Sequence, residues 1–259
     1  QRQMCIRDRF PLEFGKNILV VLEKEDNLKN LSESEFYTRN TKASSLLVLT
    51  RDDLFDNNLE STDETLKAIL KDQEFEMHLK NKISNKDIES FLAESSIGTI
   101  FYPVEDGLSK SKIKSLINIS NKFNTPILFS KSTYPYKKIG ILINNDFGES
   151  TSNSTAFDLA ASLKASLTAV NVSQPKFLQS EETSKLSNSI EKLQDMALSH
   201  EIQLDIVNEE GNEAKIFSEL SSNYDLSIIG TGNNKSWQSR KTIEYISSNS
   251  NSSILYIPS

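Results

Sequence analysis

The 259-residue sequence has a single cysteine, fewer basic than acidic residues and no long apolar run. Its one cysteine, Cys5, excludes an internal disulfide bond and a thiolate metal site, which is typical of a reducing compartment such as the cytoplasm. The formal net charge of −7 argues against binding to nucleic acid or to an anionic membrane surface, since both need a basic face. The longest apolar runs, such as SLLVLT, have the length of a strand, so we expect no membrane-spanning segment in this chain.

Motifs of catalysis are also missing. The two histidines, His78 and His200, have no cysteine or carboxylate cluster at metal-ligand spacing around them, so we expect no metal site. The sequence contains neither a G-x-S-x-G nucleophile motif nor a G-x-x-x-x-G-K-S/T phosphate loop. The adjacent acidic pairs at 181–182 and 209–210 favour solvated faces, because neighbours in sequence point apart. We therefore expect a protein that is not an enzyme and assign no catalytic residue, with weak ATP hydrolysis left open.

The first nine residues, QRQMCIRDR, are treated separately from the rest of the chain. They carry three arginines, do not start with methionine and lack the apolar core of a signal peptide. We interpret residues 1–9 as a non-native extension, similar to a translated sequencing adapter, and exclude them from the fold argument together with Cys5. The accompanying hypothesis is that natural sequence upstream of Phe10 is missing.

From residue 16 onward, short apolar runs alternate with polar or amphipathic helical segments. Strands are predicted at 16–24, 44–50, 75–81, 97–104 and 125–130. Helices are predicted between them at 28–42, 61–73, 84–96 and 109–123. Near-continuous apolar strands that alternate with helices predict a parallel α/β sheet covered by helices on both faces.

The same order of elements then repeats, with a period of about 125 residues, which is a domain length. Strands are predicted at 137–144, 166–172, 202–207, 225–230 and 252–258. Helices are predicted at 154–165, around 186–197, at 213–223 with Asn212 as cap, and at 242–248. The sequence therefore predicts two copies of one α/β domain, at residues 10–131 and 137–259. The segment KSTYPYKK, marked by Pro135, joins them.

The second half resembles a universal stress protein domain. The resemblance rests on IGILINND as first strand, LTAVNV as second, GNEAKIFSEL after the third, DLSIIGTG as fourth and EYISSNSNSSILYIP at the end. The first half is similar to the same family chiefly through IGTIFYP and NKFNTPILF. The resemblance implies a tandem universal stress protein, with two adenine nucleotide alpha hydrolase-like domains. Each would hold a five-stranded parallel sheet with helices on both faces, and the domains of this family pair through their last strands.

The family resemblance also implies a nucleotide site in the second half. Nucleotide-binding members carry an Asp after the first strand, matched by Asp146, and a loop of the form G-x-x-G-x9-G-S/T after the fourth strand. Val172 would offer its backbone to the base, and the turn at Gly230 would face phosphate, so ATP or another adenine nucleotide is the expected ligand. The cofactor-binding residues assigned on this basis are Asp146, Val172, Gly230, Thr231, Gly232, Asn233, Arg240 and Lys241.

The sequence departs from the family loop at several of these positions. Asn233 stands where the second glycine is expected, and Arg240 and Lys241 stand where Gly-Ser is expected. Glycines allow a positive φ and a close approach of the backbone to phosphate, whereas Arg and Lys supply point charges instead of a backbone cradle. In the first half Glu23 replaces the Asp, and YPVEDG replaces the glycine loop. We therefore expect any nucleotide to bind weakly and in the second half.

Two functions follow from the resemblance. The first is a cytoplasmic stress-response or signalling protein, non-catalytic or weakly nucleotide-binding, that acts through contacts with a partner protein. The alternative is the cytosolic C-terminal regulatory domain pair of a cation/proton antiporter or permease, because universal stress domains are sometimes fused behind such transporters.

The sequence makes one further prediction about architecture. Each half ends in a short apolar strand, PILFS and SILYI, and unpaired edge strands of that composition invite pairing. We predict that Ile127–Phe129 lies antiparallel to Ile254–Tyr256, which makes an intramolecular pseudo-dimer of the two halves. In that arrangement the first half serves mainly as a structural partner of the second.

Overall fold

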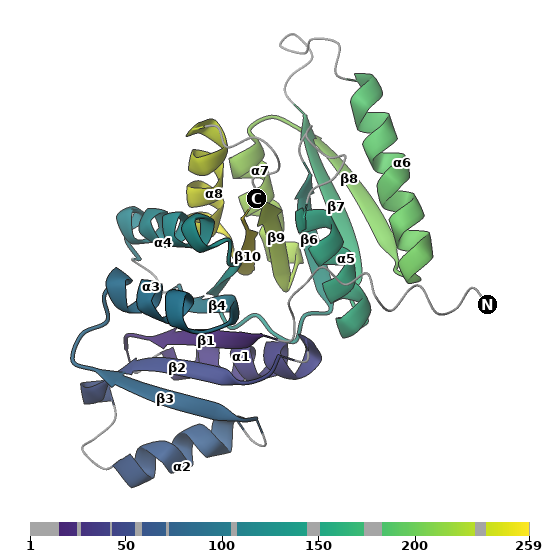
Figure 1. The fold of residues 1–259 in the computed structure, drawn as a ribbon. Coiled ribbons are helices and arrows are strands. Elements are labelled where there is room, and N and C mark those ends of the chain that lie inside the picture. The colour runs from purple at the N-terminus through teal and green to yellow at the C-terminus, as the bar shows by residue number, and fades with distance from the viewer. Residues whose placement is uncertain are drawn as a thin grey trace.

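The computed structural model shows an α/β protein whose elements follow the predicted order (Figure 1). It describes residues 16–24, 27–41, 43–54, 59–70, 73–104, 108–143, 151–173, 183–230 and 237–258. Strands and helices alternate along both halves of the chain, as the repeating pattern of apolar runs predicts. Within the described residues, no helix is long and apolar enough to cross a membrane.

All ten strands of the described chain belong to one sheet, in the order β3-β2-β1-β4-β5-β10-β9-β6-β7-β8. The strands of the first half are β1 (Asn17–Leu22), β2 (Leu46–Arg51), β3 (Phe75–Lys80), β4 (Ile97–Pro103) and β5 (Ile127–Ser130). Those of the second half are β6 (Lys138–Ile143), β7 (Ser166–Ser173), β8 (Leu204–Glu210), β9 (Leu226–Gly230) and β10 (Ser253–Ile257). The two halves therefore have the same strand order, which is the topology expected of a tandem repeat.

The seam between the halves is the antiparallel pair β5–β10, whereas the pairs within each half are parallel. Phe129 lies opposite Ile254, Leu128 opposite Leu255, and Ile127 opposite Tyr256. The predicted pairing of the two terminal strands is confirmed at this register. Because each strand covers the edge of the other, the only sheet edges left among the described strands are β3 and β8.

Helices cover both faces of the sheet. One face carries α1 (Leu28–Thr41), α2 (Leu59–Leu70), α5 (Thr151–Leu163) and α6 (Thr183–His200). The other carries α3 (Asn85–Glu94), α4 (Lys110–Phe123), α7 (Glu213–Leu220) and α8 (Trp237–Asn249). Each face has one apolar cluster, and both clusters contain residues of both halves. The apolar core is therefore continuous across the seam.

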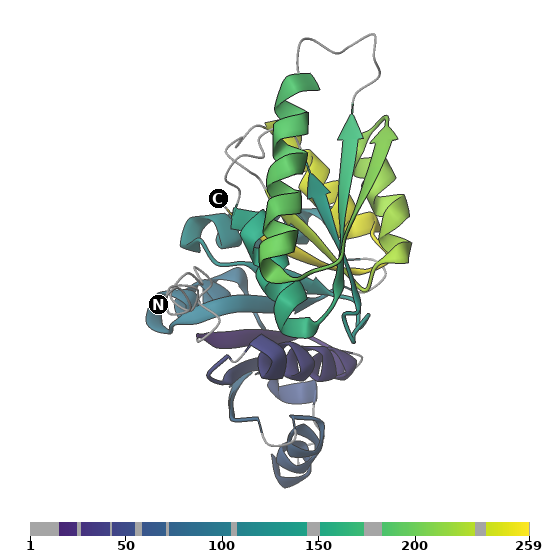
Figure 2. The ribbon, with the colours of Figure 1, turned by 90° about the vertical axis from the view of Figure 1, so that its right-hand side faces the viewer.

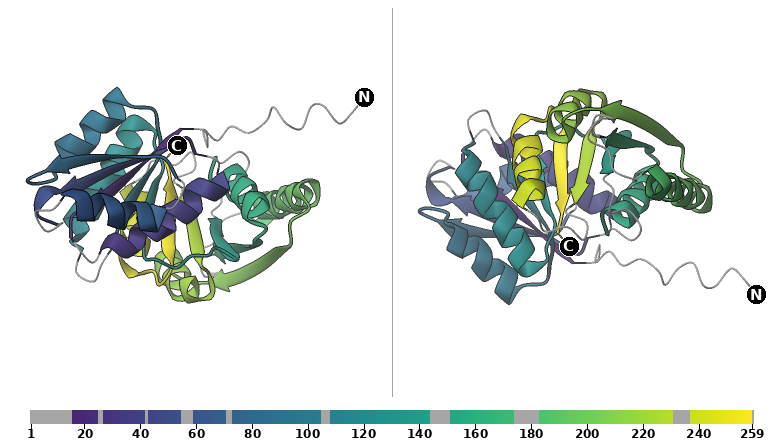
Figure 3. Two further views of the ribbon diagram at one scale, coloured as in Figure 1. Left: turned by 90° about the horizontal axis from the view of Figure 1, so that it is seen from below. Right: turned by 90° about the horizontal axis from the view of Figure 1, so that it is seen from above.

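The sheet twists strongly from one half to the other. Strands β1–β3 and strands β6–β9 run in clearly different directions in Figure 1, as the right-handed twist between neighbouring strands accumulates. Figure 2 shows α5 and α6 in front of the strands of the second half, with the first half below them. The end-on views of Figure 3 show the strands enclosed by helices in both halves.

Local sequence signals account for several helix ends. Ser84 and Asp87 form a capping box at α3, in which the Ser84 N–H donates to Asp87 Oδ2 at 2.8 Å. Asn212 Oδ1 accepts the backbone N–H of Lys215 at 2.9 Å, so the predicted cap of α7 is confirmed. The helix predicted at 242–248 is too short, since α8 begins at Trp237. Its first turn, WQSR, holds a single aromatic residue among polar ones and carries no apolar periodicity from which the start could be predicted.

Candidate ligand-binding crevice

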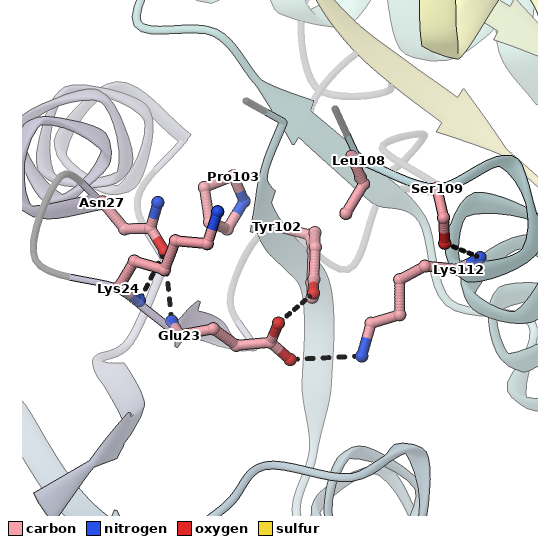
Figure 4. A pocket seen from close by; sticks show the side chains of 8 residues that line it. All are labelled: Glu23, Lys24, Asn27, Tyr102, Pro103, Leu108, Ser109 and Lys112. Carbon is pink, nitrogen blue, oxygen red and sulfur yellow. Dashed lines mark hydrogen bonds and ion pairs between the residues drawn. The ribbon is translucent and has the colours of Figure 1, made fainter. Parts of the chain in front are cut away.

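A crevice of about 330 Å³ opens at the carboxyl ends of β1 and β4 (Figure 4). Strand β2 lies on one side of β1 and strand β4 on the other, so the strand order changes direction between β1 and β4. Such a switch point is where open α/β sheets bind ligands. The crevice is lined by Glu23, Lys24, Asn27, Tyr102, Pro103, Leu108, Ser109 and Lys112.

Glu23 is placed by the turn that follows β1. The backbone N–H groups of Glu23 and Lys24 donate to Asn27 Oδ1 at 3.1 and 3.0 Å. Asn27 is only 2% exposed, so its side chain replaces the sheet partners that these two N–H groups lose when the strand ends. The Glu23 side chain that leaves this turn points toward Tyr102 and Lys112, as Figure 4 shows.

Two groups from β4 and α4 meet this carboxylate. The Tyr102 hydroxyl donates to Glu23 Oε2 at 2.8 Å, and Lys112 Nζ lies 3.1 Å from Glu23 Oε1. Ser109 caps α4 by accepting the backbone N–H of Lys112 at 3.2 Å, which sets Lys112 at the start of the helix. Lys112 Nζ also lies 5.3 Å from the centre of the Tyr102 ring.

The crevice therefore contains a half-buried ion pair with both signs of charge. The side chains of Lys112 and Glu23 are 21% and 29% exposed, so water screens the pair only in part. The Glu23 carboxylate repels a phosphate placed at the end of β1, and Pro103 at the end of β4 has no N–H to offer an anion. No group of acidic, histidine or cysteine residues in the described chain is arranged to hold a metal ion. The geometry suits a small polar molecule better than a phosphate chain.

Only part of the predicted nucleotide site lies within the described residues. Asp146, Thr231, Gly232, Asn233 and the side chain of Arg240 lie outside the described residues. Val172 near the end of β7 and Gly230 at the end of β9 reach the same, carboxyl edge of the sheet in the second half. Lys241 is exposed on α8. The assignment of these residues to a ligand stays a prediction.

Gly230 has a packing reason that is independent of any ligand. A Cβ atom at this position would lie 2.7 Å from Ser152 Oγ and 2.8 Å from Ser152 Cβ. Ser152 belongs to the first turn of α5, which therefore packs directly on the end of β9. A glycine lets this helix approach the strand.

Several buried or half-buried polar groups of the second half were not predicted from the sequence. Asn153 in α5 is 5% exposed, and its Oδ1 has no hydrogen-bond partner among the described residues. Burial raises the pKa of Asp158 to about 6, against the opposing effect of nearby His200. Burial also raises the pKa of Glu213, at the start of α7, to about 7. The sequence around these residues gives no signal that their polar side chains are buried.

The sequence analysis also did not predict that Glu23, Tyr102 and Lys112 lie together in the crevice. Glu23 was noted as the replacement for the family's Asp, but its partners Tyr102 and Lys112 are 79 and 89 residues away. The available signals were the position of Glu23 directly after a strand and the Ser109 cap one turn before Lys112. Together they place both residues at one edge of a parallel sheet.

Comparisons with known proteins agree with this topology. No family model matches the sequence, and no curated protein matches it. Among solved structures, a universal stress protein from Pseudomonas aeruginosa UCBPP-PA14 aligns with a TM-score of 0.67 and 18% identity, over 94% of this chain and 93% of that chain. A universal stress protein from Archaeoglobus fulgidus DSM 4304 aligns with a TM-score of 0.66 and 14% identity, over 95% and 98%.

A third solved structure comes from a different kind of protein. The cytoplasmic domain of a prokaryotic cation chloride cotransporter aligns with a TM-score of 0.62 and 13% identity, over 93% of this chain and 94% of that chain. The sheet order and these alignments define a two-domain α/β protein, whose first half has a crevice at a switch point of the sheet. More narrowly, the chain has the fold of a tandem universal stress protein.

Proposed function

We propose that this chain works as a universal stress protein in the cytoplasm, without strong catalysis, through contacts with a partner protein in a stress response or in signalling. The observation that carries the proposal is the ten-stranded sheet, in which two halves of identical strand order join through β5 and β10. The full-length likeness to universal stress proteins of two organisms supports it. In this proposal the two halves act as an intramolecular pseudo-dimer, and the first half is chiefly a structural partner.

The proposed ligand is a weakly held adenine nucleotide in the second half. Val172 and Gly230 at one sheet edge support this placement, with Asp146, Thr231, Gly232 and Asn233 as its remaining loop residues. In the first half, the Glu23–Lys112 ion pair opposes a phosphate at the equivalent edge. The site would then bind phosphate through the charges of Arg240 and Lys241, so its affinity should fall steeply as salt rises.

Calorimetric titration of the full chain with ATP tests the proposal. Asp146→Asn and the double substitution Arg240→Gln with Lys241→Gln should each weaken binding by about tenfold or more. Glu23→Gln in the first half is the matched control and should leave ATP affinity unchanged. If ATP binding were lost in Glu23→Gln and kept in the other two variants, the nucleotide would bind in the first half, and the assignment to the second half would be wrong.

We also propose that the nucleotide is bound without turnover. The sequence contains neither a G-x-S-x-G nucleophile motif nor a G-x-x-x-x-G-K-S/T phosphate loop, which supports this part of the proposal. Release of inorganic phosphate from ATP in the presence of a stoichiometric amount of protein should therefore equal that of buffer. Sustained release that Asp146→Asn abolishes would contradict this part of the proposal.

The second candidate function is a cytosolic regulatory domain pair of a transporter such as a cation/proton antiporter or permease. The observation that favours it is the full-length structural likeness to the cytoplasmic domain of a cation chloride cotransporter. The genomic DNA upstream of Phe10 decides between the two candidates. A continuous reading frame that encodes membrane helices would support the transporter, and an initiator codon directly before Phe10 would exclude it.

A further inference from the structure

Glu33 is a charged residue buried where the two halves of the molecule meet. It lies in the second turn of α1, and its side chain is 0% exposed. Helix α1 belongs to the first half and packs against α5 of the second half on the same face of the sheet. No lysine, arginine or histidine in the described part of the chain forms an ion pair with Glu33. Its charge must therefore be stabilised by hydrogen bonds.

Four donors supply these hydrogen bonds. Glu33 Oε1 accepts the hydroxyls of Tyr136 and Ser253, both at 2.6 Å. Glu33 Oε2 accepts the backbone N–H of Ser132 at 3.0 Å and the hydroxyl of Ser130. These donors come from three places: the end of β5, the connecting segment 131–137 and the start of β10. One carboxylate of the first half is thus bonded to the connection and to the last strand of the second half.

A second layer of contacts fixes the donors themselves. Asn30, one turn before Glu33, accepts the Ser132 hydroxyl at 2.6 Å through its Oδ1, which also lies 3.0 Å from Ser130 Oγ. Ser253 Oγ also accepts the backbone N–H of Lys131 at 2.8 Å. The Ser253 N–H donates to Thr133 Oγ1 at 2.9 Å. The connecting segment therefore follows a fixed path between α1 and β10 instead of forming a free tether.

Thr133 extends this path into the second half. Its hydroxyl donates to the carbonyl oxygen of Asp225 at 2.6 Å, and Asp225 Oδ2 accepts the N–H groups of Lys137 and Lys138 at 2.8 and 2.9 Å. Asp225 directly precedes β9. The bonded chain of residues runs from α1 through the connection to the amino ends of β6, β9 and β10.

A buried carboxylate without a cation is stable only while its hydrogen bonds are made, and removal of its partners leaves an uncompensated charge. The Ser253 bond forms only when β10 of the second half lies beside β5, and the bonds of Ser132 and Tyr136 form only when the connection follows its path along α1, so the full set of four bonds requires the docked arrangement. We propose that Glu33 is the positioning residue of a clasp that fixes the two halves in one relative orientation. The clasp consists of Asn30, Glu33, Ser130, Ser132, Tyr136 and Ser253.

The clasp goes beyond the proposed function, since it requires neither a nucleotide nor a partner. It also has no counterpart that repeats with the fold, because the donors Ser132 and Tyr136 belong to the connection, which occurs once. The apolar seam of β5 and β10 brings the halves together without direction, as hydrophobic burial is non-directional. The hydrogen bonds of Glu33 add the directional term that selects one orientation.

The test replaces Glu33 by methionine, which keeps its length and removes its acceptors. The matched control is Glu35→Met, because Glu35 on the same helix is also buried and pairs with Arg39 of its own helix, 3.4 Å away. Spin labels at Lys114→Cys and Lys192→Cys, both exposed and in different halves, report the relative orientation by pulsed electron resonance after Cys5→Ser. Hydrogen exchange of the β5 and β10 amides reports the seam.

We expect a narrow distance distribution in the parent protein and in Glu35→Met, and a clearly broader one in Glu33→Met. In Glu33→Met, hydrogen exchange of the β5 and β10 amides should accelerate about tenfold more than exchange of the β1 and β7 amides. In Glu35→Met, exchange should accelerate equally in the strands of both halves. Glu33→Gln, which keeps one acceptor oxygen, should restore part of the narrow distribution. A Glu33→Met protein with an unchanged distance distribution, or with equal acceleration everywhere, would overturn the clasp.

A milder pair of variants covers the case in which Glu33→Met does not fold. Tyr136→Phe and Ser253→Ala each remove one donor and leave the carboxylate in place. Each should broaden the distance distribution, and the double variant should broaden it further. If both variants fold with the parent's distribution and unchanged exchange at the seam, Glu33 has no positioning role.

Discussion

The Tyr102 hydroxyl donates a 2.8 Å hydrogen bond to the carboxylate of Glu23, and so ties the carboxyl end of β4 to that of β1. The bond spans the point where the strand order of the first half changes direction. The crevice floor is thus built from protein groups that satisfy one another. The Glu23–Lys112 ion pair and the Tyr102–Glu23 hydrogen bond should therefore contribute measurably to the free energy of unfolding.

Removal of either partner of Glu23 should destabilise the protein. We expect Tyr102→Phe to lower the free energy of unfolding by about 1 kcal/mol, since one hydrogen bond to a charged group is lost. Lys112→Met should cost about 1 kcal/mol, because it leaves a half-buried carboxylate without its cation. Urea denaturation measures both changes. The control Lys114→Met, at an exposed site of the same helix, should stay within about 0.5 kcal/mol of the parent.

A side chain at position 230 should disturb the contact between β9 and α5. Gly230→Ala places a Cβ 2.7 Å from Ser152 Oγ, and we expect a loss of about 1–3 kcal/mol in unfolding free energy. Ser152→Gly removes the obstructing atoms, so the double variant should recover part of the loss despite the cost of a helical glycine. Additive effects of the two substitutions in urea denaturation would show that the contact is not the cause.

Glu213 should make the protein less stable as the pH rises. Burial raises its pKa from 4.5 to about 7, so between these pH values the unfolded chain gives up the proton while the folded chain keeps it. The contribution of this carboxyl to stability is thus present at pH 4.5 and is lost as the pH approaches 7. Glu213→Gln should remove this loss of stability. The unfolding free energy of the variant minus that of the parent should therefore be about 1–3 kcal/mol larger at pH 8 than at pH 4.5. Urea denaturation across this range should give diverging curves, and parallel curves would contradict the effect.

Asp158 should act with the same sign at lower pH. Burial raises its pKa from 3.8 to about 6, with His200 opposing the change, so its stabilising contribution is lost as the pH rises from about 4 to 6. As the pH rises through this range, the unfolding free energy of Asp158→Asn should increase by about 1–2 kcal/mol relative to that of the parent. Above pH 7 the difference should stay constant. Direct titration of the side chain by carbon-detected magnetic resonance is an independent measurement. A folded-state pKa near 4 would refute the expectation.

Much of the fold could be predicted because its determinants are local. The apolar run of β1, the capping residues Ser84 and Asn212, and the helical spacing of buried residues in α4 are each contained in a short stretch of sequence. The pairing of β5 with β10 was also predictable, because an apolar terminal strand needs a partner. Helix starts such as that of α8 were less predictable, since its first turn has one aromatic residue among polar ones and shows no apolar periodicity.

The crevice and the clasp were decided by the tertiary structure. Helix α1 has polar residues on its buried side, among them Asn30 and Glu33, and a polar stripe in a sequence normally indicates a solvated face. Tyr136 and Ser253 stand 103 and 220 residues from Glu33, and Tyr102 stands 79 residues from Glu23. The sequence by itself determined the strands, the helices and their repeat, because backbone propensity and apolar pattern act over one or two turns. Which buried charge meets which donor was settled only when the sheet brought distant segments together, since a hydrogen bond depends on position in space and leaves no periodic pattern along the chain.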